Sequence, residues 1–317
     1  MIAAISGCGS SALDQAVVIG GSPSSQPVVS LAVDRFAREN LLARFDISMT
    51  GSEQGLGKLC DGLVDLAVTA REMSPTESEA CDGSGIPLAK IPVARDAIVL
   101  FTNKDNPSGV SCISLPQIYS LVGPESAGVD TWNGGAQIAR ALGENDGLSN
   151  GKLTLIGPPP TSSTVDLLID QTVAPFSAIR KSASEIRPDY RTLASDAMIP
   201  SEVARQRSSI GFADFEKAQR WRDQVRFLKV NSGRSCVPAT ASTIRSGEYA
   251  LSRSQLLYVN TKAAANNATL AAFVSFVLEP ERLVAEGNAA GVALPAYEIE
   301  KANKEWEQAA DAAGVQR

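Results

Sequence analysis

The stretch SMTGSEQGLGKLCDGLVDLAVTAREMSPTE, residues 48–77, combines the end of a strand, a turn, a short helix and a second strand. Thr50 and Ser52 flank the glycine of the turn, and either hydroxyl is suited to the helix N-cap. Leucines then recur at helical spacing. The apolar run 63–70 has the composition of a strand that is buried on both faces of a parallel sheet, and Arg71 follows it directly.

The places of Ser52 and Arg71 in this pattern indicate a binding site. In an open α/β sheet, ligands bind beyond the carboxyl ends of the strands, where helix N-termini offer free N–H groups and a partial positive charge. We therefore expect Ser52 and Arg71 to converge on a small oxyanion. The alternative is that Ser52 only caps its helix and Arg71 only pairs with a surface carboxylate.

The same order of strand, hydroxyl-rich turn and helix occurs twice more. Strand 17–20 leads into SPSS at 22–25, and strand 153–156 leads into TSST at 161–164. One such turn is a weak signal because hydroxyls cap helices generally. Three together predict several helix N-termini directed at one anion. Strands and helices alternate along the chain, which predicts an α/β fold.

Composition limits the function classes. The chain has 317 residues, of which 44% are hydrophobic, so we expect two domains with ample core. The net charge of −6 argues against a nucleic-acid partner. Histidine is absent, which removes Ser–His and Cys–His nucleophile pairs and most zinc sites. We expect no enzymatic activity, no metal site and no cofactor, and no apolar run is long enough for a membrane span.

The five cysteines are Cys8, Cys60, Cys81, Cys112 and Cys236. They form no CxxC pair, so zinc ribbons and thioredoxin-like sites are disfavoured. The number fits two disulfides and one special cysteine, and disulfides would imply an oxidising compartment. The alternative is five unrelated buried thiols in a cytoplasmic protein. Residues 77–85, which include Cys81, are expected to form a loop.

The segment Ile5-Ser6-Gly7-Cys8 resembles a bacterial lipobox, in which the cysteine is lipidated and becomes the mature N-terminus. We therefore expect residues 1–12 to be the remnant of a lipoprotein signal and a tether. The segment before Cys8 is too short for a signal peptide, so we expect the signal to begin upstream. The alternative is a frayed N-terminus with a chance cysteine.

Six segments carry a more specific pattern: GSPSSQP at 21–27, GSEQG at 51–55, LCDGLVDLAVTAR at 59–71, PVARDAI at 92–98, SST at 162–164 and IRSGEYALSR at 244–253. Together they resemble the periplasmic phosphate-binding proteins of ABC importers, over about residues 18–295. The segments at 92–98 and 244–253 are similar to the family's outgoing and returning hinge strands.

The resemblance implies a type 2 periplasmic-binding-protein fold. It has two lobes, each a mixed sheet flanked by helices, and a hinge of two crossing strands. Residues 13–99 and 250–317 would form lobe 1, and residues 100–249 lobe 2. The implied function is to capture inorganic phosphate or a related oxyanion between the lobes and deliver it to an ABC permease in the inner membrane. A periplasmic monomer anchored through Cys8 would do this.

The resemblance also implies a set of oxyanion-binding residues. Lobe 1 would supply Ser22, Ser24, Ser25, Ser52 and Arg71, and lobe 2 would supply Ser162, Ser163, Thr164 and Asp196. Glu53 and Gln54 stand where the family has glycines, and Gln26 stands where it has a tyrosine. A carboxylate at position 53 should repel an anion unless it points away, so the identity of the oxyanion, and its binding, stay open.

We expect disulfides between Cys60 and Cys81, which are close in sequence, and between Cys112 and Cys236, near which the family also tends to carry cysteines. Two other functions stay open. One is a non-transporting relative that acts as an anion sensor or adhesion domain. The other is a carboxylate-dependent phosphohydrolase that uses Asp65 and Asp196, with Glu53 as a third candidate.

Overall fold

The computed structural model describes residues 15–279, 282 and 291–315, so Cys8 and the proposed tether lie outside the described residues. The chain divides into two compact units, unit 1 (Met1–Ala94 and Ser254–Arg317) and unit 2 (Arg95–Arg253). The strands β4 (Leu88–Asn103) and β12 (Ser252–Asn260) each have residues in both units. Among the described residues, none of the helices has the length and apolar character needed to cross a membrane.

Unit 1 is a mixed sheet with helices on both faces. Besides parts of β4 and β12, unit 1 contains the following strands and helices: β1 (Val17–Gly21), α1 (Gln26–Glu39), β2 (Phe45–Ser48), α2 (Ser52–Cys60), β3 (Leu66–Thr69), α3 (Pro75–Gly83), α11 (Thr261–Asn266), α12 (Ala268–Val277) and α13 (Ala296–Ala313). The strand order is β2-β1-β3-β12-β4. Strand β1 is parallel to β2 and β3, whereas β12 is antiparallel to β3.

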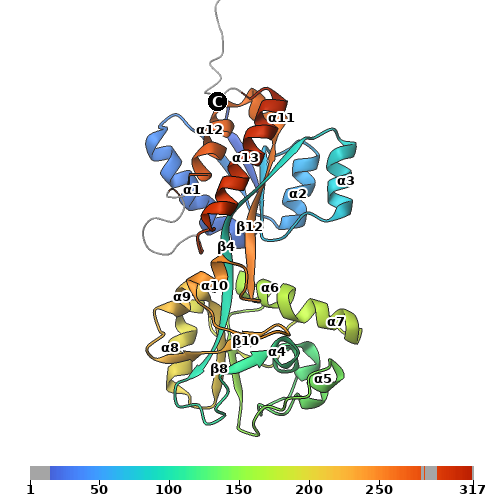
Figure 1. Ribbon diagram of the computed structural model, residues 1–317, viewed down its shortest axis with the longest axis vertical. Helices are drawn as coiled ribbons and strands as arrows, with labels where there is room; N and C mark the ends of the chain where they lie inside the picture. The colour runs from blue at the N-terminus through green and yellow to red at the C-terminus, as the bar shows by residue number, and fades with distance from the viewer. Residues whose placement is uncertain (1–14, 280–281, 283–290, 316–317) are drawn as a thin grey trace, which may run out of the picture. The chain divides into compact units, whose positions relative to one another are not determined.

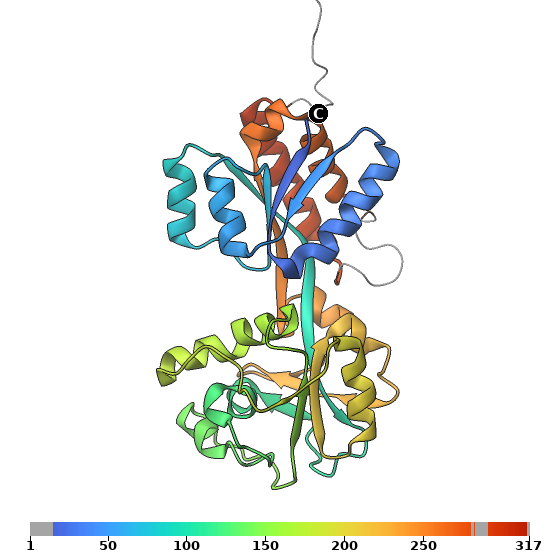
Figure 2. The same cartoon turned by 180° about the vertical axis from the view of Figure 1, so that it is seen from behind.

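The two faces of this sheet bury alternate side chains. Val17 and Ile19 pack with α1, α12 and α13 in the larger core, whereas Val18 faces the smaller core under α2. This is the period of two that a strand covered on both faces requires. Figures 1 and 2 show α2 and α3 side by side, away from α1, α12 and α13.

The expectation of a loop at 77–85 is wrong, because Pro75–Gly83 is helix α3. Ser74 caps this helix, and its hydroxyl accepts the N–H of Glu77 while the Glu77 carboxylate accepts the N–H of Ser74. This reciprocal capping box, with Pro75 in the first turn, is a strong helix start. The helix lacks an apolar stripe, since Cys81 is its one buried residue.

Unit 2 contains the second mixed sheet and a smaller one. Its helices are α4 (Leu115–Val122), α5 (Ala136–Ala141), α6 (Ser163–Leu168), α7 (Ala174–Arg180), α8 (Ile199–Arg205), α9 (Phe215–Gln219) and α10 (Ala241–Arg245). Its strands are β5 (Cys112–Ser114), β6 (Thr154–Gly157), β7 (Arg191–Thr192), β8 (Ser209–Asp214), β9 (Val225–Phe227), β10 (Lys229–Asn231) and β11 (Cys236–Val237).

The sheets of unit 2 have a simple order. Strands follow β4-β8-β6-β7, with β9 also paired to β4, and the small sheet is β11-β10-β5. Strand β6 is parallel to both β7 and β8, so the carboxyl ends of these three strands lie at one edge. Helix α6 continues through a π-helical turn at Ile169–Val173 into α7.

Candidate functional site

Unit 1 places Ser22, Ser52 and Arg71 at one edge of its sheet. Because β1, β2 and β3 are parallel neighbours, their carboxyl ends meet at the same edge. Ser22 follows the end of β1, Ser52 opens the helix after β2, and Arg71 follows β3 by two residues. The strand ends thus bring together residues that are far apart in the sequence.

The first two turns are also joined directly. The N–H of Gly51 donates to the carbonyl of Gly21 at 2.9 Å. Gly55 packs so closely on this turn that a Cβ on it would lie 2.7 Å from the Cα of Gly21. The predicted cap by Thr50 or Ser52 is wrong, since Gly51 takes the N-cap with a φ of 138°, a backbone conformation that favours glycine. Ser52 is instead the first residue of α2.

The three serines of the first turn differ in their surroundings. The Ser22 hydroxyl accepts the N–H of Ser24 at 3.3 Å, and the two hydroxyl oxygens lie 2.8 Å apart. Both side chains are half-buried. Ser25 is fully buried and donates its proton to the side chain of Gln255 on β12. Ser22 and Ser24 are therefore better placed than Ser25 to reach a ligand.

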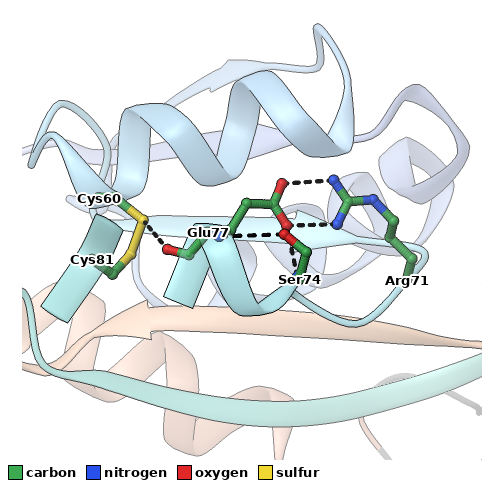
Figure 3. The surroundings of a disulfide bond; sticks show 5 residues. All are labelled: Cys60, Arg71, Ser74, Glu77 and Cys81. Atoms are coloured by element: carbon green, nitrogen blue, oxygen red, sulfur yellow. Dashed lines mark hydrogen bonds and ion pairs between the residues drawn. A yellow bond between two sulfur atoms is a disulfide. The ribbon is translucent and has the colours of Figure 1, made fainter. Parts of the chain in front are cut away.

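Arg71 is bound to a carboxylate of α3. Its two terminal nitrogens donate to the two oxygens of Glu77 at 2.8 and 2.7 Å (Figure 3). One of these nitrogens also donates to the Glu72 carbonyl at 3.0 Å. The bonds from Arg71 and from Ser74 lower the pKa of Glu77 to about 2. Glu77 is therefore ionised at neutral pH, and the carboxylate pairing that the sequence left open for Arg71 is present.

Arg71 and Glu77 line a cavity of about 510 Å³ between α2 and α3. The other lining residues are Glu53, Gly57, Cys60, Asp61, Ser74, Thr76, Ala80 and Ser84. Ser22, Ser24 and Ser52 are outside this set, so within the described chain the guanidinium group and the predicted hydroxyls do not share this cavity. The exposed Glu53 lines the cavity together with Arg71.

In unit 2 the third turn lies beside Asp196. The Ser162 hydroxyl caps α6 by accepting the N–H of Val165 at 3.2 Å. The Thr164 hydroxyl donates to the carboxylate of Asp196, which also accepts the N–H of Asp214 at 3.2 Å. These residues lie at the edge where β6, β7 and β8 end. The Thr164 proton is committed to Asp196 rather than open to a ligand.

A buried arginine of unit 2 was not singled out from the sequence. The side chain of Arg253 is 6% exposed, lies 3.2 Å from Asp170 and 3.6 Å from Asp96, and donates to the carbonyl of Ser163 at 3.4 Å. Arg253 therefore binds the backbone of the third turn. The sequence does contain an indication of this contact, since both Asp96 and Arg253 lie in segments that resemble the family's hinge strands.

Asp96 also faces a second carboxyl group. Burial raises the pKa of Asp96, and burial together with the charge of Asp96 raises the pKa of Asp214 to about 7. Arg253 opposes the shift at Asp96, and Lys217 opposes both. Repulsion between the two carboxylates adds to the cost of their burial, so the pair favours retention of a proton near neutral pH.

Two disulfides are present, and both have the expected partners. Cys60 is joined to Cys81 in unit 1, and Cys112 to Cys236 in unit 2. The first links the end of α2 to α3, which tethers the helix that holds Arg71.

Comparison with known proteins places the chain among binding proteins. Residues 7–281 match the model of a PBP superfamily domain. The chain is 25% identical to the protein SphX of Synechococcus elongatus over 83% of this chain and 73% of that protein. It is 24% identical to the phosphate-binding protein PstS of Staphylococcus epidermidis, over 84% of this chain and 75% of that protein.

Solved structures show the same fold. A possible phosphate binding protein from Planctomyces limnophilus superposes with a TM-score of 0.76 at 20% identity, covering 93% of this chain and 99% of that one. An ABC-type phosphate transport receptor from Vibrio cholerae gives 0.65 at 18% identity, covering 88% and 100%. These structures confirm the predicted type 2 periplasmic-binding-protein fold. The family model covers most of the sequence, and the chain therefore belongs to the PBP superfamily.

Proposed function

We propose that this protein is an extracytoplasmic solute-binding protein that captures inorganic phosphate, or a related small oxyanion, and delivers it to an ABC permease. The names of its relatives support this, since they include a phosphate-binding protein and an ABC-type phosphate transport receptor. The structural observation that carries the proposal is the edge of unit 1. There Ser22, Ser52 and Arg71 follow three adjacent parallel strands, and α1 and α2 begin.

The proposed ligand groups are those that the sequence resemblance implies: Ser22, Ser24, Ser25, Ser52 and Arg71 of unit 1, and Ser162, Ser163, Thr164 and Asp196 of unit 2. These hydroxyl groups differ in whether their protons are already used in hydrogen bonds within the protein. Ser25 and Thr164 give their protons to Gln255 and Asp196. We propose that these two hold their turns in shape, while the other hydroxyls and the free backbone N–H groups of the helix starts donate to the anion.

The proposed location rests on chemistry. Disulfides persist in oxidising compartments and are rare in the cytosol, so the two disulfides support a site outside the cytoplasm. Lipid anchoring through Cys8 and a monomeric state belong to the same proposal. Mass spectrometry of protein from a bacterial host that lipidates would test the anchor, and light scattering would test the monomer.

Calorimetric titration with phosphate and with sulfate tests the function, and Arg71→Ala tests the site. A hydrogen bond to a charged group contributes about 1.5–3 kcal/mol, so the variant should bind phosphate roughly 10- to 150-fold more weakly. Arg38→Ala is the matched control, because it removes one positive charge from the exposed end of α1. Equal affinities of Arg71→Ala and the wild type would contradict the placement of Arg71.

The same titration tests the first of the other two functions, and a phosphatase assay tests the second. A sensor or adhesion domain without a ligand site predicts no heat with any oxyanion. A carboxylate-dependent phosphohydrolase predicts release of phosphate from a phosphomonoester, whereas a binding protein releases none.

A further inference from the structure

The Glu77 carboxylate that pairs with Arg71 is fixed in position by several contacts. The ion pair is bidentate, and the Arg71 and Glu77 side chains are 40% and 17% exposed. One Glu77 oxygen also accepts the N–H of Ser74 at 2.8 Å, so the carboxylate is part of the capping box that starts α3. A flexible surface carboxylate pays side-chain entropy to form such a pair, whereas this one is already fixed by its helix.

The helix itself is fastened to α2. Cys81 lies one turn after Glu77 on α3 and is joined to Cys60, whose sulfur lies 3.5 Å from the carbonyl oxygen of Glu77. Figure 3 shows the disulfide, the capping box and the ion pair in one row along α3. The position of the Glu77 carboxylate is thus set by a covalent link at one end of the helix and by the cap at the other.

We propose that Glu77 sets the affinity of the oxyanion site by competing with the ligand for Arg71. This inference rests on the proposed function. A bound anion must either share the guanidinium group with Glu77 or displace it, because both present oxygens to the same N–H donors. In either case the anion meets a fixed negative charge within a few ångströms of its cation, and the affinity is lower than Arg71 alone would give.

The surroundings of the pair strengthen this competition. Glu53 and Asp61 line the same cavity as Arg71 and Glu77, so carboxylates outnumber the guanidinium group among the residues that form it. Two charges about 4 Å apart interact by about 1 kcal/mol in water and about 4 kcal/mol at a protein surface. Because Arg71 is partly exposed, we expect a value near the lower limit, which is about a fivefold change in affinity.

Glu77→Gln is the sharpest test. Glutamine can replace glutamate in a capping box and can still accept a hydrogen bond from Arg71, so the substitution removes the charge and keeps the local structure. We expect the variant to bind inorganic phosphate about fivefold more tightly in calorimetric titration at low ionic strength, and the gain to shrink at high salt. Glu79→Gln makes the same charge change at an exposed position of α3 and should stay within twofold of the wild type.

A double variant tests whether Glu77 acts through Arg71. In Arg71→Ala only the direct repulsion between Glu77 and the anion remains, so Glu77→Gln should improve the affinity less in that background than in the wild type, and the difference measures the part that acts through Arg71. Circular dichroism would verify that each variant is folded. Failure of the wild type to bind phosphate would reject the proposed function itself. If the wild type binds, this inference is overturned by a Glu77→Gln affinity equal to that of Glu79→Gln, by weaker binding, or by an equal gain in the Arg71→Ala background.

Discussion

The carboxyl groups of Asp96 and Asp214 in unit 2 are expected to make the stability of the protein depend on pH. Asp214 ends β8 and caps α9 by accepting the N–H of Lys217 at 3.1 Å, and its carboxyl group is repelled by the charge of Asp96 on β4. Its raised pKa of about 7 means that the folded protein binds a proton that the unfolded chain has lost. The perturbation is Asp214→Asn, since asparagine is as good an N-cap as aspartate and cannot ionise.

The sign follows from the direction of the shift. A carboxyl group whose pKa is raised on folding contributes stability at pH values below its unfolded pKa of about 4, and that contribution is lost as the pH rises through about 7. A shift of about three pKa units corresponds to at most about 4 kcal/mol. Asp214 is half-buried, so solvent screens part of this energy and we expect about 2 kcal/mol. Asp96 changes stability in the same direction, because its pKa is raised too.

Thermal unfolding followed by circular dichroism at pH 5 and pH 8 measures the effect. Relative to the wild type, Asp214→Asn should be only partly stabilised at pH 5, which is about one unit above the unfolded pKa, and fully stabilised at pH 8, by about 4–8 °C in Tm for a unit of this size. Asp223→Asn, an exposed substitution in the same unit, should shift both values little. Parallel pH profiles of the wild type and Asp214→Asn would refute the reasoning, since they would mean that the pair does not retain a proton on folding.

Two further predictions concern unit 1. Gly55→Ala should lower stability by a few kcal/mol in urea unfolding, because its Cβ would lie 2.7 Å from the Cα of Gly21, whereas Gly57→Ala on the same helix meets open space and should raise stability by about 0.5–1 kcal/mol. The reverse order would contradict the close packing of the two turns. Replacing Cys60 and Cys81 together by serine should cost about 3 kcal/mol, since the bond closes a loop with a sequence separation of 21. Free thiols in non-reduced peptides of the wild type would disprove the bridge.

The sequence was sufficient to predict where functional groups lie, because strand ends determine that. Ser22 and Arg71 follow apolar runs, Ser52 follows the end of a strand and a turn, and parallel pairing of β1, β2 and β3 brings these strand ends to one edge. The Ser114 cap of α4 was likewise predictable, since its capping box with Gln117 is local. Such features depend on residues within one turn or one strand.

The helix α3 was missed for a physical reason. An amphipathic pattern was the signal used for helices, and α3 buries only Cys81. Its stability comes from the Ser74–Glu77 capping box and the disulfide instead. The capping box is visible in the sequence as Ser74-Pro75-Thr76-Glu77, and this pattern by itself indicates the start of a helix.

The partners of the charged groups could not be predicted. Asp96 reaches Asp214 through the pairing of β4 with β8, and it reaches Arg253 because β12 lies beside β4. Contacts between segments so far apart depend on register, and a shift of one residue would turn these side chains to the opposite face. No local pattern contains that information.

The charges at the two edges lead to a common conclusion about binding. Arg71 is paired with Glu77 in unit 1, and Arg253 is held by Asp96 and Asp170 in unit 2. An oxyanion that approaches either arginine therefore meets a cation whose charge is already balanced. Under the proposed function, we expect much of the binding free energy to come from hydroxyls and helix N–H groups, which donate without a counter-charge of their own. We then expect the carboxylates beside the arginines, Glu77 above all, to set how strongly an anion is held.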